Sequence, residues 1–151
     1  MKTRTGFVSN SSSSSFIVIG SYPMQQNIDR VKQHSVLGES LTVYAKDGKC
    51  EYGWEHEQTT DVFSKLIFAY LQARDVKKNK PEYMRLLNKT LKKALGVKKI
   101  YWNIGDWEGY IDHQSSASEG ANDEMFESQD ALTRFIFSDE SYIQGGNDND
   151  C

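Results

Sequence analysis

Three segments after residue 60 carry apolar residues at the three- and four-residue spacing of an amphipathic helix. The first predicted helix covers residues 62–71. The second begins at Pro81, a residue suited to the first helical turn, and ends at Gly96. The third begins after Ser128, and its inward-facing positions are Ala131, Leu132, Phe135 and Ile136. The pattern therefore predicts two to three helices that each bury one face.

Shorter apolar runs predict strands. Residues 16–19 form a β-branched run that Gly20 closes, and alternate positions are apolar in residues 97–104. We expect residues 110–111 to pair beside that second strand. Residues 41–45 and 50–54 flank an Asp-Gly pair at Gly48, which is a strong hairpin signal because glycine tolerates the positive φ of the turn.

These elements do not alternate strictly, which favours an α+β fold over a doubly wound parallel sheet. We expect a small mixed or antiparallel sheet with a β-hairpin, packed against two to three helices. One domain of residues 16–143 would carry this fold. A serine-rich leader of residues 1–15 would precede it, and a polar tail of residues 144–151 would follow.

The 151 residues are about the size of one domain, and charge is segregated along them. The net charge is only −3. Residues 74–99, however, carry ten basic and two acidic side chains, whereas residues 100–151 carry one basic and twelve acidic ones. Two such blocks either face and neutralise each other or stay apart and leave charged surfaces that steer partners.

Cysteine content and hydropathy exclude several classes of protein. The two cysteines, Cys50 and Cys151, make neither a disulfide framework nor a zinc cluster, so we expect no metal and no cofactor. No apolar run approaches the roughly eighteen residues that span a bilayer, and residues 16–19 are shorter than a signal-peptide core. We therefore expect a cytoplasmic protein with no membrane partner.

The N-terminal segment is the most distinctive part of the sequence. Residues 4–18 read Arg-Thr-Gly-Phe-Val-Ser-Asn, five serines and Phe-Ile-Val. This segment resembles a leader shared by many small uncharacterised proteins of bacteriophages and of prophage-bearing bacteria. Residues 110–115, 135–137 and 146–149 more loosely resemble the C-terminal part of some of those proteins. The resemblance implies phage-type origin and expression in the host cytoplasm, and it supplies no catalytic residue or cofactor.

The serine run of the leader allows three interpretations. Consecutive backbone N–H groups can bind an anion, although the glycine and lysine spacing of a phosphate loop is missing here. A recognition tag and a flexible leader are the alternatives. The residues concerned are Ser9, Asn10, Ser11, Ser12, Ser13, Ser14 and Ser15.

Aromatic and acidic residues are mixed between positions 101 and 110. Such mixtures are typical of protein interfaces, where aromatic side chains anchor and charges steer, and they are equally typical of ordinary cores. Our main hypothesis is a non-enzymatic accessory protein that binds another protein. The resemblance implies a host protein of the takeover or defence machinery. The candidate contact residues are Trp102, Trp107, Tyr110, Asp106 and Glu108.

His113 supports the alternative of a small hydrolase or nucleotide-modifying enzyme. An imidazole can act as a base or as a pH switch near neutrality. Asp112 precedes it, and Ser115 would share its face of a strand at a two-residue spacing. Nothing marks Ser115 as a strained nucleophile, and a hydrogen-bonding histidine at a strand end is the simpler interpretation.

The helix that begins at Pro81 supports a further alternative, a nucleic-acid-binding protein. Four cations on its outer face would neutralise phosphates and give binding that weakens with salt. The chain has no helix-turn-helix or zinc-finger pattern, and its acidic last third would repel a polyanion. The residues concerned are Arg85, Lys89, Lys92 and Lys93.

Overall fold

The structure is a computed structural model that describes residues 13–53, 57–75, 80–111 and 122–147. Short helices and strands are mixed along the chain. In chain order they are β1 (Ser13–Val18), α1 (Gln25–Ser35), β2 (Val36–Leu37), β3 (Ser40–Tyr44), η1 (Ala45–Asp47), β4 (Glu51–Tyr52), β5 (Glu57–Thr59), α2 (Val62–Asp75), α3 (Lys80–Leu95), β6 (Lys99–Asn103), β7 (Tyr110–Ile111), η2 (Asn122–Glu127), α5 (Gln129–Phe137) and β8 (Tyr142–Asn147).

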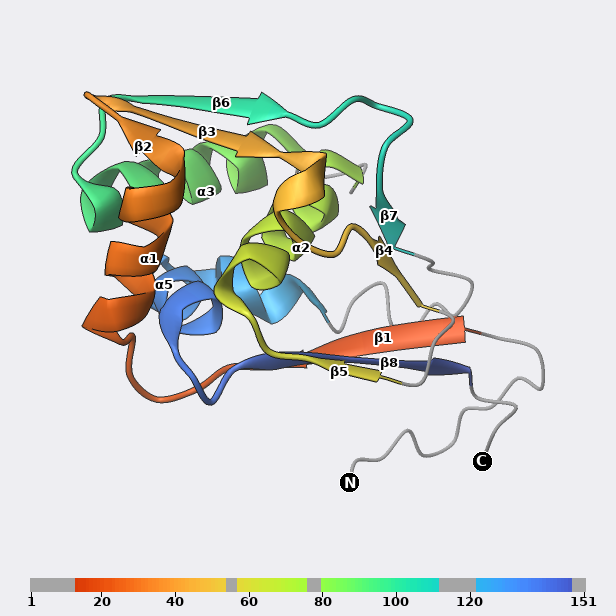
Figure 1. Cartoon of the computed structure of the whole chain (residues 1–151). Coiled ribbons are helices and arrows are strands. Elements are labelled where there is room, and N and C mark those ends of the chain that lie inside the picture. Colours follow the sequence, from red (N-terminus) through yellow and green to blue (C-terminus); the bar gives the residue numbers. More distant parts are fainter. Residues whose placement is uncertain (1–12, 54–56, 76–79, 112–121, 148–151) are drawn as a thin grey trace.

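The helices lie between two small sheets (Figure 1). One sheet has the strand order β1-β8-β5 and is antiparallel throughout. The other has the order β2-β3-β6, in which β2 runs antiparallel and β6 parallel to β3. Strands β4 and β7 form a separate parallel pair. The α+β prediction, with small mixed and antiparallel sheets packed against helices, is confirmed.

The three predicted helices are confirmed as α2, α3 and α5. Gly96, at φ 69°, follows the last residue of α3. The Ser128 hydroxyl accepts the Ala131 N–H at 3.0 Å and so caps α5. Helix α2 differs from its prediction, because all residues from Ser64 to Ala73 are buried instead of one face only. Helix α2 is the central helix, and it lies between the two three-stranded sheets among the other helices (Figure 1).

The hairpin predicted around Gly48 is wrong. Strand β3 pairs with β2 and β6, whereas β4 pairs with β7. The Asp47 carboxylate accepts the Tyr44 N–H at 2.9 Å, which stabilises the helical turn η1 where a strand reversal was expected. The structure forms a hairpin earlier in the chain, where Gly38, at φ 63°, lies in the tight turn between β2 and β3.

The predicted pairing of residues 110–111 beside the strand of residues 97–104 is also wrong. Strand β6 pairs with β3, with Ile100 opposite Leu41. Strand β7 pairs with β4, with Ile111 opposite Tyr52. The turn at residues 105–109 redirects the chain away from β6 before β7 begins (Figure 1).

The first and last strands extend past the predicted domain limits. Strand β1 begins at Ser13, within the expected leader, and β8 continues to Asn147, within the expected tail. The two strands pair along all six residues of each. The last three serines of the run therefore belong to a sheet, while residues 9–12 lie outside the described residues.

Lys65 of α2 is completely buried, and its amine binds backbone carbonyl oxygens just after the end of α5. Its Nζ donates to the carbonyl oxygen of Ser138 at 2.7 Å and to that of Ser141 at 3.1 Å. Burial lowers the pKa of Lys65 from 10.5 to about 8, and the charges of Asp139 and Asp61 oppose that shift without cancelling it. The amine therefore satisfies backbone carbonyls at the cost of burying a cation.

This burial predicts that the stability difference between the wild type and Lys65→Met grows with pH. Between about pH 8 and 10.5 the unfolded chain binds more protons than the folded one at this group, so the unfolding free energy rises with pH. We expect the wild type to gain about 2–3 kcal/mol on the variant across this range, measured by urea unfolding at several pH values. Other titrating groups, such as Tyr52, are common to both proteins. A difference that does not change with pH would contradict the prediction.

Candidate protein-binding site

The chain reverses between β6 and β7 in a turn of residues 105–109, which we call the Trp107 turn. The Glu108 N–H donates to the Gly105 carbonyl oxygen at 2.9 Å, and the Gly105 N–H donates to Glu108 Oε1 at 2.7 Å. Gly109 has φ 78°, and a Cβ there would lie 3.0 Å from the Cys50 carbonyl oxygen. Glycine is therefore needed where the turn returns to the body of the protein.

Arg74, in the last turn of α2, holds the backbone of the Trp107 turn through hydrogen bonds. Its guanidinium donates to the carbonyl oxygens of Gly105 at 3.1 Å, Glu108 at 3.0 Å and Gly109 at 2.9 Å. The same group makes two bonds to the Asp75 carboxylate, at 2.8 and 3.1 Å. The hydrogen bond to Asp75 raises the pKa of Arg74, and only 9% of the arginine side chain is exposed. The backbone of the turn is therefore anchored to the central helix.

Two stacked aromatic rings, Tyr70 and Trp102, connect Arg74 to strand β6. The Arg74 guanidinium lies 5.9 Å from the centre of the Tyr70 ring, and that ring stacks on Trp102 at 4.5 Å. The Trp102 Nε1–H donates to Asn88 Oδ1 of α3 at 2.9 Å. Trp102 therefore lies half-buried on the inner side of β6, apart from the other candidate contact residues, and its role in the fold is support.

The remaining candidate contact residues are exposed together on the turn and beside it. Trp107 is 98% exposed and Tyr110 is 46% exposed, while Asp106 and Glu108 are exposed acidic residues on either side of the tryptophan. Tyr101, on the outer side of β6, is 51% exposed. The Trp107 turn thus presents an exposed indole with an acidic residue before and after it in the sequence, on a backbone held by Arg74.

The sequence contains no signal for the residues that hold this turn. Arg74 lies about thirty residues before the turn that it binds, and arginine at the end of a helix is ordinary. Tyr70 follows the apolar spacing of α2, which predicts burial but not a stack with Trp102. The aromatic and acidic composition of residues 101–110 was the only available indication of the site.

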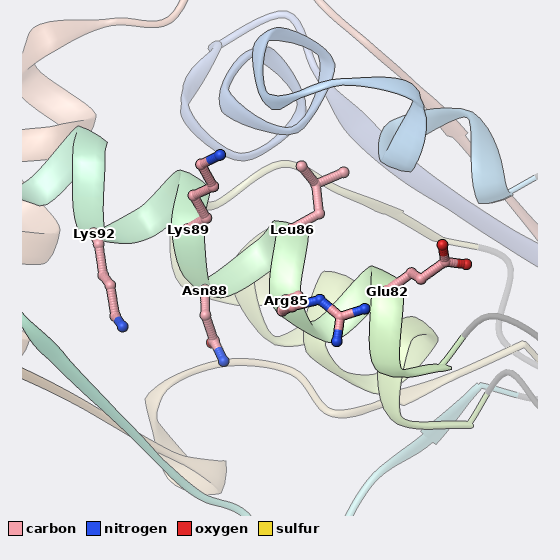
Figure 2. A pocket seen from close by; sticks show the side chains of 6 residues that line it. All are labelled: Glu82, Arg85, Leu86, Asn88, Lys89 and Lys92. Carbon is pink, nitrogen blue, oxygen red and sulfur yellow. The ribbon is translucent and has the colours of Figure 1, made fainter.

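The predicted basic face of α3 is the second candidate surface. Arg85, Lys89, Lys92 and Lys93 are all exposed, and none of them forms an ion pair with another described residue. A shallow hollow of about 590 Å³ lies between the side chains of this one helix (Figure 2). Its lining residues are Glu82, Arg85, Leu86, Asn88, Lys89 and Lys92.

The two charge blocks of the sequence do not neutralise each other within the described residues. The ion pairs there are local, such as Arg74 with Asp75 and Arg134 with Asp130, and no described pair joins residues 74–99 to residues 100–147. No described ion pair therefore joins the acidic residues of the Trp107 turn to the basic face of α3, and both sets of charges are exposed.

The candidate catalytic residues His113, Asp112 and Ser115 lie outside the described residues. Within the described ranges, no group of three or more His, Cys, Asp or Glu side chains is placed to hold a metal ion. Cys50 is a free thiol whose pKa is raised, chiefly by burial.

Comparison with protein-family models, with curated proteins and with solved structures found no match to this chain. In the described part of the chain, no helix combines the length and the apolar character needed to cross a bilayer.

Proposed function

We propose that the protein is a phage-type accessory protein that acts without catalysis, by binding a host protein through the Trp107 turn. The observation that carries this proposal is the exposure of 98% of Trp107 on a turn whose backbone is held by Arg74. The host protein as partner class rests on the resemblance of the N-terminal segment to phage proteins.

Exposure of Trp107 alone would be a weak argument, since single apolar residues are common on protein surfaces. The support beneath it is what favours binding. Three carbonyl oxygens of the turn accept hydrogen bonds from one arginine, so the indole is displayed with little backbone freedom left to lose. Tryptophan is among the residues that most often dominate the binding energy of an interface.

The flanking carboxylates indicate the charge of the partner surface. Asp106 and Glu108 are exposed on either side of Trp107, and no described cation pairs with either carboxylate. We therefore expect a partner with an apolar pocket for the indole and basic residues around it, because complementary charge speeds association and suppresses wrong partners.

Replacing Trp107 with alanine is expected to weaken partner binding at least about tenfold while leaving the fold intact, because the indole contacts no core. The measurement is a pulldown from host lysate with the tagged protein, followed by titration of the one stoichiometric partner against wild type and variant.

Tyr22→Ala is the matched control, since Tyr22 is also a large aromatic residue, 74% exposed, in the loop before α1. We expect this variant to retain the partner. Equal retention by Trp107→Ala would show that the turn is not the contact surface. Arg74→Lys extends the test, because lysine keeps the charge but cannot hold three carbonyl oxygens with a planar fork, and it should weaken binding less than Trp107→Ala.

A further inference from the structure

Strand β6 is an edge strand beside the Trp107 turn. In its sheet it pairs with β3 alone among the described strands, so the backbone groups of alternate β6 residues point away from the sheet. No other described residue forms a backbone hydrogen bond with residues 100–103. An open hollow of about 710 Å³ lies along this strand. Its lining residues are Thr42, Ile100, Tyr101, Trp102 and Asn103.

Helix α3 contacts strand β6 next to two of its cations, Arg85 and Lys92. Asn88 of α3 accepts the Trp102 N–H of β6, which fixes the helix against the inner side of the strand. Asn88 and Lys92 point to the same side of α3, and the Arg85 side chain extends along the helix toward Glu82 (Figure 2). Asn88 lies between Arg85 and Lys92 along the helix and contacts β6, so helical spacing places both cations on the face of α3 that carries this contact.

We propose that this edge binds an acidic, extended segment of the partner protein, which adds to the sheet as a fourth strand next to β6. Its inward side chains would be carboxylates that meet Arg85 and Lys92 of α3. Its outward side chains would lie beside Tyr101 and Lys99 on the exposed face of the sheet. This proposal rests on the proposed protein-binding function and names the segment that would be recognised.

The dimensions of the two elements agree with such a complex. Lys92 comes seven positions after Arg85 in the helix, which corresponds to roughly 10 Å along the axis. Carboxylates at alternate positions of a strand are roughly 7 Å apart, so two or three of them cover that span. Main-chain bonds to β6 would supply affinity, and the charges on α3 would supply the preference for acidic side chains.

The charges also favour a peptide over nucleic acid at this edge. A strand forms N–H···O=C bonds with β6, and nucleic acid has no equivalent ladder. The acidic residues Asp106 and Glu108, exposed just beyond the end of β6, would repel a phosphate backbone that continued along the edge. A polypeptide can place neutral or basic residues there.

The test uses the full-length protein and synthetic peptides, with no need for the natural partner. The probe is a capped peptide of about eight residues in which glutamate alternates with valine, a length that covers β6 and its ends. The controls are the same peptide with lysine for glutamate, and two versions that are N-methylated on one or the other set of alternate amides. Affinity is measured by titration, and hydrogen exchange of the β6 amides is measured in parallel.

We expect the acidic peptide to bind and to slow hydrogen exchange at alternate amides of β6, and the lysine peptide not to bind. One N-methylation pattern should abolish binding and the other should preserve it, because only one edge of an added strand faces β6. The double variant Arg85→Glu, Lys92→Glu should weaken binding at least about tenfold, and Lys93→Glu should have a smaller effect.

Three results would overturn the proposal. They are equal binding by both N-methylated peptides, no change in β6 exchange on binding, and tighter binding of a single-stranded oligonucleotide than of the acidic peptide. Each is independent of the partner test with Trp107→Ala, so loss of the strand-addition proposal would leave the proposed function standing. Conversely, peptide binding together with retention of the partner by Trp107→Ala would remove the turn from the interface and keep the edge.

Discussion

Replacing Lys65 with alanine is expected to lower the unfolding free energy by about 3 kcal/mol or more. The side chain is fully buried, so deleting every atom beyond Cβ leaves a cavity in the core around α2. The carbonyl oxygens of Ser138 and Ser141 also lose their donor in the same step. Because whole domains are stable by only about 5–15 kcal/mol, this single change removes a large part of the margin.

Two further variants separate the causes of this loss. Lys65→Met keeps most of the stem and removes only the amine, so its cost at neutral pH should be about 1–3 kcal/mol, from the carbonyl oxygens left without a donor. Lys89→Ala removes an exposed lysine without a described ion pair and should stay within about 0.5 kcal/mol of the wild type. Urea unfolding followed by circular dichroism measures all three. A Lys65→Ala protein as stable as Lys89→Ala would contradict the prediction.

The expected cost is high because Lys65 stabilises a junction of three elements. The Ser141 hydroxyl donates to the Arg134 carbonyl oxygen at 2.7 Å and accepts the Gly20 N–H at 2.7 Å. The Arg134 guanidinium donates to the Gly20 carbonyl oxygen at 3.1 Å. Three segments therefore meet where Lys65 of α2 donates to two carbonyl oxygens. They are the segment after β1, the end of α5 and the start of β8.

Helices with many apolar contacts were predictable from spacing, and α1 was not. Helices α2, α3 and α5 each carry apolar residues at helical spacing, which is the strongest signal that a single sequence contains. Helix α1 buries only Asn27 and Val31, and the amide of Asn27 donates to the Phe137 carbonyl oxygen and to Asp139, at 2.8 Å each. A helix that docks through a polar side chain leaves little apolar periodicity to detect.

The candidate site was predictable in composition but not in geometry. The sequence indicates Asp106, Trp107, Glu108 and Tyr110 as a mixed aromatic and acidic group, and these four are exposed. The apolar alternation in residues 97–104 predicts that Trp102 lies on the buried side of the strand with Ile100, but it does not indicate the stack of Trp102 on Tyr70. The sequence also cannot indicate Arg74, because the bonds that fix the turn go to backbone carbonyl oxygens, which every sequence has.

The hairpin prediction at Gly48 is wrong because glycine can serve two structural purposes. It can adopt positive φ in a turn, or it can allow two chain segments to approach closely. The Asp-Gly pair predicts a turn with positive φ at Gly48. Its observed φ and ψ, −161° and −169°, are extended values that any residue adopts. The requirement for glycine comes instead from a close approach between chain segments: a Cβ at Gly48 would lie 2.8 Å from the Ser64 backbone nitrogen and 2.9 Å from the Phe63 carbonyl carbon.

Gly48→Ala is therefore expected to destabilise the protein by about 2–3 kcal/mol, because the neighbouring atoms are helix backbone and cannot rotate away. The displaced segment would also weaken the bond from the Lys49 N–H to Ser64 Oγ, now 2.8 Å, and the contact between the Tyr52 hydroxyl and the Ser64 carbonyl oxygen, now 2.9 Å. Urea unfolding measures the loss.

Gly38→Ala is the control that distinguishes crowding from backbone strain. Gly38 has φ 63°, and a Cβ there meets no atom within 4 Å, so alanine should cost only the roughly 1 kcal/mol of an unfavourable φ. If crowding is the reason for glycine at position 48, Gly48→Ala must be the less stable of the two, although its backbone angles suit alanine. A Gly48→Ala protein that is more stable than Gly38→Ala would contradict the crowding explanation, because the close approach to α2 would then cost less than one strained dihedral angle.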